Sequence, residues 1–289
     1  MSKKLKRILA VLLATVLISA FVSDIISANP QLKFYVNDYL TANERKVKLT
    51  EIAIDASEIQ LSELLRRENA DFNQSLMLIN KDNHLSDDFS PDIQNYKDTD
   101  VKMNKCVVSA YETLSKAVLE KFGQKLLISS AYRTDEEQAV LEKENEYATE
   151  VGASEHCAGL SLDVYVKYHA GKGFLKTESG VFVNENCWEY GFIVRYPYYG
   201  EKTTGIEFEP WHLRYVGFPH AEIIYKNRLT LEEYISSLEY GKFYKYGEYI
   251  VTRQTGDTPK IPTDFDFVTV SHDNQNGYIY TLKNVKQLT

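Results

Sequence analysis

An acidic residue inside an apolar strand is the feature that most limits how this chain can fold. Residues 160–166 alternate, so that Leu160, Leu162, Val164 and Val166 share one face of a predicted strand. Asp163 then lies on the opposite face. Because a buried carboxylate is costly unless it is paired or binds a metal, this strand predicts a sheet that carries a charged or metal-binding site on one face.

Two histidines and a second carboxylate lie near this strand in the sequence or follow it. His156 precedes it in a glycine-bounded loop that can fold back toward Asp163. A second predicted strand, residues 206–209, ends at Pro210, since proline cannot donate to a sheet ladder. The bend matters because Glu209 and His212 are three residues apart, and a straight strand would direct them to opposite faces.

Two histidines and one carboxylate with an open fourth position are the usual ligands of a catalytic zinc site. A further glutamate that does not bind the metal can accept a proton from the attacking water. HExxH is absent, which excludes the common zincin arrangement. On spacing alone, structural histidines beside a strand remain the alternative.

Four linked motifs make the chain recognisable over residues 75–240. They are Ser-Ala-Tyr-Arg-Thr at 130–134, SxHxxGxxxD at 154–163, Tyr-Gly-Phe-Ile-Val-Arg-Tyr-Pro at 190–197, and ExxH at 209–212. In this order they resemble the VanY-like D-alanyl-D-alanine carboxypeptidases, zinc peptidases grouped with VanX-type dipeptidases and LD-carboxypeptidases.

The resemblance implies a role for each matching residue. His156, Asp163 and His212 would hold Zn²⁺, and Glu209 would be the catalytic base. Arg133 would face the substrate and stabilise developing negative charge, whereas its alternative is a surface salt bridge to Asp135 or Glu136. Gln138 and Ser154 match positions that contact the peptide terminus.

The implied activity is removal of the C-terminal D-Ala from peptidoglycan stem peptides, with a link to glycopeptide resistance or to ordinary wall maturation. Within the same fold, LD-carboxypeptidase or peptidoglycan endopeptidase activity is an alternative. An alternative of another class is a non-catalytic cell-wall binding module. The presence of both Glu209 and Arg133 favours an enzyme.

The three cysteines, Cys106, Cys157 and Cys187, are too few for a disulfide scaffold. Cys157 stands where the family usually has threonine, and Cys187 where it usually has a small residue. We hypothesise a Cys157–Cys187 disulfide, with two buried free thiols as the alternative. The histidines at 84, 169, 220 and 272 have no ligand-type neighbours and are expected at the surface or in turns.

The remaining patterns predict an α+β fold, an antiparallel-sheet zinc peptidase domain with flanking helices plus a small C-terminal β appendage. Helices are expected at 106–122, 135–150, 184–190 and 231–238, and strands at 75–80, 126–130, 160–166, 193–196 and 206–209. Three further short strands are expected at 249–253, 267–271 and 278–282. The expected domains are a signal peptide or N-terminal membrane anchor (1–28), a helical stalk or linker (29–74), a zinc carboxypeptidase domain (75–240) and a small β module (241–289).

The N-terminus has the composition of a targeting segment. Four basic residues within positions 3–7 precede an uncharged apolar run from Ile8 to Val22, which reads as a cleaved secretory signal or as an uncleaved anchor. Either reading places the protein outside the cytoplasm, in a bacterial cell envelope, with membrane contact if the segment is retained. The net charge of −8 argues against a nucleic-acid partner.

Overall fold

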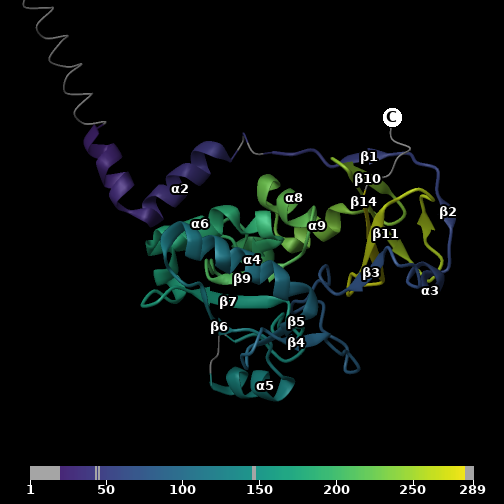
Figure 1. Cartoon of the computed structure of the whole chain (residues 1–289), viewed down its shortest axis with the longest axis horizontal. Helices are drawn as coiled ribbons and strands as arrows, with labels where there is room; N and C mark the ends of the chain where they lie inside the picture. Colours follow the sequence, from purple (N-terminus) through teal and green to yellow (C-terminus); the bar gives the residue numbers. More distant parts are fainter. Residues whose placement is uncertain (1–19, 43, 45, 145–147, 284–289) are drawn as a thin grey trace, which may run out of the picture.

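A computed structural model describes residues 20–42, 44, 46–144 and 148–283. The main body (residues 75–240) is built on a four-stranded antiparallel sheet in the order β6-β7-β9-β8 (Figure 1). These strands are β6 (Leu127–Ser130), β7 (Ser161–Tyr165), β9 (His212–Tyr215) and β8 (Phe192–Val194). The expected α+β class with an antiparallel sheet and flanking helices is confirmed.

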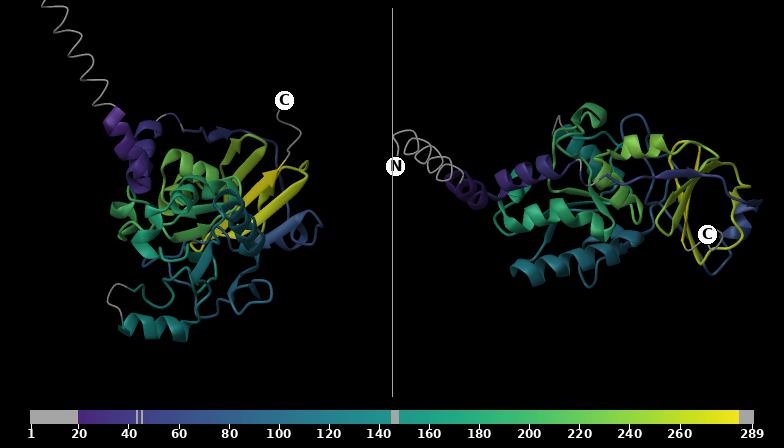
Figure 2. Two further views of the ribbon diagram at one scale, coloured as in Figure 1. Left: turned by 60° about the vertical axis from the view of Figure 1, so that its left-hand side comes forward. Right: turned by 90° about the horizontal axis from the view of Figure 1, so that it is seen from above.

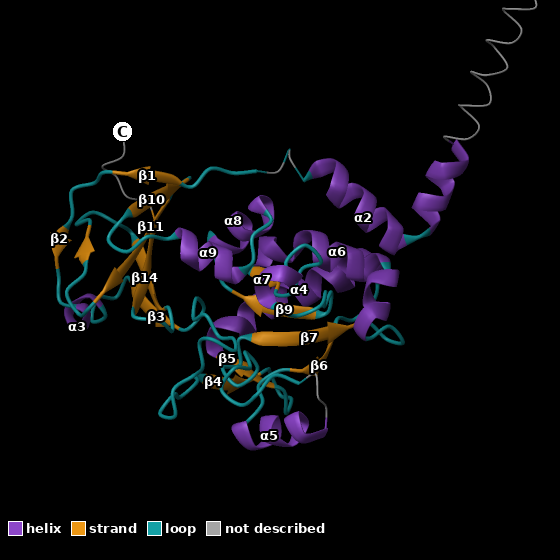
Figure 3. Cartoon of the chain, turned by 180° about the vertical axis from the view of Figure 1, so that it is seen from behind, coloured by secondary structure: helices purple, strands orange, loops and turns teal. Residues whose placement is uncertain are grey.

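Helices pack on both faces of this sheet (Figure 3). On one face lie α4 (Lys105–Phe122), α6 (Glu178–Asn186) and the 3-10 helix η2 (Cys187–Tyr190), and on the other lies α5 (Asp135–Glu144). Val107, Leu114 and Val118 on α4 meet the apolar face of β7 in the main core. Asn104 caps the start of α4 and Gly123, at φ 65°, ends it, so the helix expected at 106–122 is confirmed.

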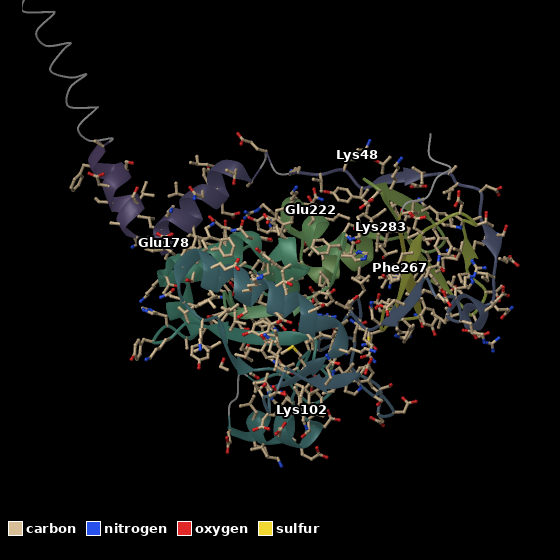
Figure 4. All side chains as sticks on the ribbon, viewed as in Figure 1. Lys48, Lys102, Glu178, Glu222, Phe267 and Lys283 are labelled. Atoms are coloured by element: carbon tan, nitrogen blue, oxygen red, sulfur yellow. The ribbon has the colours of Figure 1, made fainter. Side chains whose placement is uncertain are left out.

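The other elements of the main body are short. They are β4 (Ile93–Asn95), β5 (Lys102–Asn104), η1 (Gly171–Lys176), α7 (Glu201–Thr204), α8 (His220–Asn227) and α9 (Leu231–Ser237). Lys102, labelled in Figure 4, marks the β4–β5 hairpin on the side of the molecule where α5 lies. The strands expected at 75–80 and 206–209 do not form. The backbone of both segments is irregular, and the hydrogen bonds that it makes are not those of a sheet.

Residues 50–73 and 243–283 together form a second unit, which we call the β-module. Its six-stranded sheet has the order β1-β10-β11-β14-β13-β3, and β13 pairs in parallel with β3. The strands are β1 (Thr50–Ile52), β10 (Phe243–Tyr246), β11 (Tyr249–Thr255), β14 (Gly277–Lys283), β13 (Phe267–His272) and β3 (Ala70–Asn73), and a two-stranded sheet joins β2 (Ser57–Glu58) to β12 (Lys260–Ile261). Phe267 and Lys283, a cross-strand pair, are labelled in Figure 4.

This arrangement corrects the expected boundaries. The helical stalk predicted over 29–74 is helical only at α2 (Pro30–Thr41) and α3 (Leu61–Leu64) among its described residues, and the rest supplies strands to the β-module. The apolar spacing that suggested a stalk helix instead packs Leu61 and Leu64 against β-module strands, with Val268 and Leu282 in the same core. The module is therefore assembled from both ends of the chain.

The β-module and the main body share a hydrophobic core. Leu76, Ile193 and Ile235 of the body lie in one buried cluster with Val251 and Ile279 of the module. The module thus packs on the body as an integral layer.

The N-terminal helical residues 20–28 and the β-module lie at opposite ends of the molecule (Figure 2). Phe34 on α2 packs against Leu175 and Val181, which fastens α2 to the main body. Most of the predicted signal or anchor, residues 1–19, lies outside the described residues. Among the described residues, no helix has the length and apolar character needed to cross a membrane.

Candidate active site and metal centre

Three predicted metal ligands converge on one point. His156, Asp163 and His212 each offer a ligand atom, and these atoms lie within 4.8 Å of one another. Asp163 and His212 are direct partners across β7 and β9, which explains their proximity. His156 Nε2 is 3.5 Å from Asp163 Oδ2, and His212 Nδ1 is 3.3 Å from Asp163 Oδ1.

The loop that carries His156 is shaped by a tight turn. His156 Nδ1 lies 2.7 Å from the carbonyl oxygen of Ala131, so this nitrogen donates and Nε2 faces Asp163. Gly159 follows at φ +66°, and a Cβ there would lie 2.8 Å from Asn104 N. Glycine therefore satisfies both the backbone conformation and the close approach that fold His156 toward the strand.

The electrostatics of this cluster favour a cation. Asp163 Oδ1 is buried and has no hydrogen-bond partner in the part of the chain that the structure describes. Burial alone would lower the pKa of His212, but the neighbouring carboxylates of Asp163, Glu155 and Glu209 raise it to about 10. Two imidazole nitrogens and a carboxylate oxygen in a negatively charged pocket form a donor set that fits Zn²⁺.

Glu209 lies beside this cluster without being part of it. Its Oε2 is 3.4 Å from His212 Nδ1, and its backbone N–H donates to the carbonyl of Tyr196 at 3.0 Å. Burial raises the pKa of the Glu209 carboxyl above its usual value, and His212 only partly opposes this. A carboxylate with a raised pKa is suited to accept and return a proton.

Arg133 lies just before the start of α5, and its guanidinium donates hydrogen bonds to two uncharged side chains. Its Nη1 donates to Gln138 Oε1 at 2.5 Å and its Nη2 to Ser130 Oγ at 2.8 Å. Among the described residues, no carboxylate lies within ion-pair distance of Arg133, so the salt bridge to Asp135 or Glu136 is not formed. Within the described part of the chain, the guanidinium charge is therefore not neutralised by a carboxylate.

These side chains line one pocket of about 210 Å³, to which both the sheet and α5 contribute residues. It brings together every residue that the motifs singled out: Arg133, Gln138, Ser154, His156, Asp163, Glu209 and His212. Trp211, half-buried, lines the same pocket and also packs on the main core.

Two residues of the site were missed by the sequence reasoning. Glu155 is fully buried between Arg195 and Arg214, and Tyr196 places its ring 5.0 Å from that of His212. Burial works against ionisation of Glu155, but Arg214 and Arg195 hold its pKa well below the usual range. The signal available in the sequence was an acidic residue inside the SxHxxGxxxD motif and two arginines in otherwise apolar strands.

The hypothesised disulfide is not formed, since Cys106, Cys157 and Cys187 are all free thiols. Cys187 lies in the main core, whereas Cys157 lines a different pocket together with Tyr132 and Asp135. Burial raises the pKa of both Cys157 and Cys187 to about 12, as expected of inert, structural thiols.

Comparison with known proteins agrees with this geometry. The family model described as VanY, D-alanyl-D-alanine carboxypeptidase, matches residues 100–218. The bifunctional D-Ala-D-Ala dipeptidase and D-Ala-D-Ala carboxypeptidase VanXYC of Enterococcus gallinarum is 35% identical over 179 residues, covering 55% of this chain and 93% of that protein. The chain belongs to the VanY family.

Two further comparisons show how much of the chain is similar to known proteins. A D-alanyl-D-alanine carboxypeptidase of Enterococcus faecium is 36% identical over 199 residues, which are 64% of this chain and 63% of that protein. The chain thus spans less than two thirds of this relative's length. The solved structure of the vancomycin resistance D,D-pentapeptidase VanY from a VanB-type resistance cassette, a mutant in complex with Zn(II), is 28% identical with a TM-score of 0.50 and covers 56% of this chain and 98% of that one.

Proposed function

We propose that this VanY-family protein is a zinc-dependent D-alanyl-D-alanine carboxypeptidase that removes the C-terminal D-Ala from peptidoglycan stem peptides. The observation that carries the proposal is the convergence of His156, Asp163 and His212 with Glu209 3.4 Å from His212 Nδ1. Family membership and the Zn(II) complex of the related VanY support the metal and the substrate class.

His156, Asp163 and His212 would hold Zn²⁺, whose Lewis acidity polarises a carbonyl oxygen and makes water acidic enough to be deprotonated near neutral pH. Glu209 Oε2 accepts the proton of the attacking water and returns it to the leaving amine. The burial that raises its pKa makes this carboxylate a stronger base than an exposed glutamate.

Arg133, which lines the same pocket, supplies positive charge for the negative charge that develops on the scissile carbonyl oxygen. Both ends of the Gln138 amide are engaged, one by Arg133 and one by the carbonyl of Thr149. We therefore assign to Gln138 the positioning of Arg133, and to Ser154, which lines the pocket, contact with the peptide terminus.

The N-terminal segment would deliver this activity outside the cytoplasm, where stem peptides and their precursors are found. It would do so as a cleaved signal or as a retained anchor. Trimming of D-Ala-D-Ala ends there would connect the protein to glycopeptide resistance, the process named for the solved VanY.

The test is incubation of the full-length chain with a stem pentapeptide, with products identified by mass spectrometry. Release of free D-Ala, lost on chelation and restored by Zn²⁺, is the expected result. Release of the D-Ala-D-Ala dipeptide would assign the protein to the dipeptidase branch. Cleavage of a tetrapeptide alone would assign LD-specificity. No product, with Zn²⁺ bound, would favour a non-catalytic binding module.

A further inference from the structure

A buried carboxylate lies directly behind one metal ligand. Glu155 Oε1 accepts hydrogen bonds from Arg195 Nε at 2.6 Å and from Arg214 Nη1 at 2.5 Å. Glu155 Oε2 accepts from Ser161 Oγ at 2.7 Å and lies 3.6 Å from His212 Nε2. Glu155 is not one of the three convergent ligands.

The two ring nitrogens of His212 therefore face different partners. Nδ1 faces the ligand cluster, at 3.3 Å from Asp163 Oδ1 and 3.4 Å from Glu209 Oε2. Nε2 is buried, has no hydrogen-bond partner among the described residues, and points toward Glu155 Oε2. A small rotation of the imidazole would shorten the 3.6 Å separation to a hydrogen bond, and such contacts often tighten when a site is loaded.

We propose that Glu155 is a positioning residue that keeps the proton of His212 on Nε2, so that Nδ1 presents its lone pair to the metal. This inference rests on the proposed zinc function. An ionised carboxylate can only accept hydrogen bonds, so the nitrogen that faces it must carry the proton. A metal-binding histidine is commonly oriented through its second ring nitrogen in this way.

Glu155 is itself fixed from several directions. Arg195 donates through Nη1 and Nη2 to both carboxylate oxygens of Glu232 on α9, at 3.0 and 2.6 Å. Arg214 Nη2 donates to the carbonyls of Ser75 and Met77, at 3.0 and 2.7 Å. Neither guanidinium can follow a movement of Glu155 without breaking these contacts.

The support continues into the β-module. The backbone N–H of Leu76 donates to Ser271 Oγ at 2.9 Å, and that of Leu78 to the carbonyl of Asp273 at 3.1 Å. Residues 75–78 are thus held between Arg214 and β13. The β-module would brace the metal site through this segment.

The first experiment reads the tautomer of His212 in the wild-type chain by ¹H–¹⁵N NMR of the histidine rings, before and after addition of Zn²⁺. The expected result in the Zn²⁺-bound state is a proton on Nε2 and a metal-induced shift confined to Nδ1. In that state, a proton on Nδ1 or coordination through Nε2 would overturn the proposal. This measurement needs no variant and no turnover.

The second experiment compares Zn²⁺ affinity in the variants Glu155→Gln and Glu232→Gln by competition with a chromophoric chelator. In Glu155→Gln the arginines attract the amide oxygen, so the NH₂ group turns toward His212 and favours the wrong tautomer. We expect Zn²⁺ binding about 10- to 100-fold weaker, the range seen when such supporting groups are removed. Glu232→Gln makes the same chemical change one step further from His212, where it weakens only the anchoring of Arg195, so its loss of Zn²⁺ affinity is expected to be smaller than that of Glu155→Gln.

Zn²⁺ binding by Glu155→Gln at wild-type strength would overturn the proposal, as would an equal loss in both variants. If Glu155→Gln does not fold, two measurements replace it: the tautomer of His212 in the wild-type protein and the Zn²⁺ affinity of the variant Glu155→Asp. The aspartate keeps the charge but holds it further from His212. Turnover by a wild-type protein that carries its proton on Nδ1 would refute this inference and leave the proposed function intact. Failure of the wild-type protein to bind Zn²⁺ would refute both.

Discussion

Glu209 Oε2 lies 3.4 Å from Nδ1 of His212, although the two residues are three positions apart in a segment that was expected to be a strand. A straight strand would have placed them on opposite faces. The segment instead turns at Pro210, with the N–H of His212 donating to the carbonyl of Glu209 at 3.2 Å, and β9 begins at His212. The bend thus brings the proposed metal ligand and the proposed base into one pocket.

Replacement of Glu209 by Gln should reduce kcat by about 10²- to 10⁴-fold, because the amide cannot accept the proton of water. Zn²⁺ content should be unchanged, since Glu209 is not one of the three convergent ligands. D-Ala release and metal analysis of the purified variant test this. Glu207→Gln is the control, because Glu207 is exposed and pairs with Lys172 at 3.0 Å. Wild-type turnover by Glu209→Gln would contradict the assigned role.

Removal of metal should abolish D-Ala release and lower the stability of the fold. Rebinding at a free Zn²⁺ concentration of 100 Kd should raise the free energy of unfolding by about 2.7 kcal/mol through mass action. Thermal unfolding with and without Zn²⁺ measures the effect. In Asp163→Asn the stabilisation should disappear, since Asp163 supplies the charged ligand. An undiminished shift in that variant would place the ion elsewhere.

Arg133→Lys should lower kcat by about 10²- to 10³-fold, the range found when one donor to a developing oxyanion is removed. Lysine keeps the charge but cannot bond Gln138 and Ser130 through separate nitrogens, as the guanidinium does. Steady-state kinetics on the pentapeptide check this. Arg67→Lys, at an exposed ion pair with Glu63, serves as the control. Unchanged kcat in Arg133→Lys would argue for a merely structural arginine.

Acid should destabilise the protein through His220, which was expected at the surface and is instead buried. Its ring nitrogens lie 2.6 Å from Tyr234 Oη and 2.9 Å from Thr281 Oγ1, and burial lowers its pKa to about 3. Above about pH 6.5 both folded and unfolded states are neutral at this residue, so no stability is lost. Between pH 6.5 and 3 only the unfolded state binds the proton, and each unit of falling pH costs about 1.4 kcal/mol.

Urea unfolding of the wild type and of His220→Gln from pH 8 to pH 4.5 tests this effect. The difference in free energy of unfolding between the two should narrow as pH falls below 6.5, because the variant lacks the titrating group. His169→Gln, at an exposed position, should run parallel to the wild type. Parallel curves for His220→Gln would show that His220 is not the titrating group.

The parts of the structure that the sequence predicted well depend on local pattern. The alternation of residues 160–166 assigned the apolar face of β7 and left Asp163 on the other face, and the structure confirms both. The helix over 106–122 was marked by its apolar spacing and by Gly123. These features follow from interactions within a few residues, which the order of amino acids already contains.

The spacing of the residues alone predicted a metal site only as an alternative to structural histidines. The four motifs together predicted the complete set of ligands. The strand register makes Asp163 and His212 cross-strand partners, 3.3 Å apart between Oδ1 and Nδ1, which supports that expectation.

The structure alone decided which residues far apart in the chain come together. Glu155, Arg195, Arg214 and Glu232 form one buried charge cluster, and no local pattern indicates that their charges compensate one another. The same holds for His220, for the free Cys157 and Cys187, and for a β-module assembled from residues 50–73 and 243–283. A short apolar segment is compatible with a helix or a strand, and only its packing partner decides between them. A charged side chain can be buried without a large free-energy cost only where the fold places an opposite charge or hydrogen-bond partners beside it.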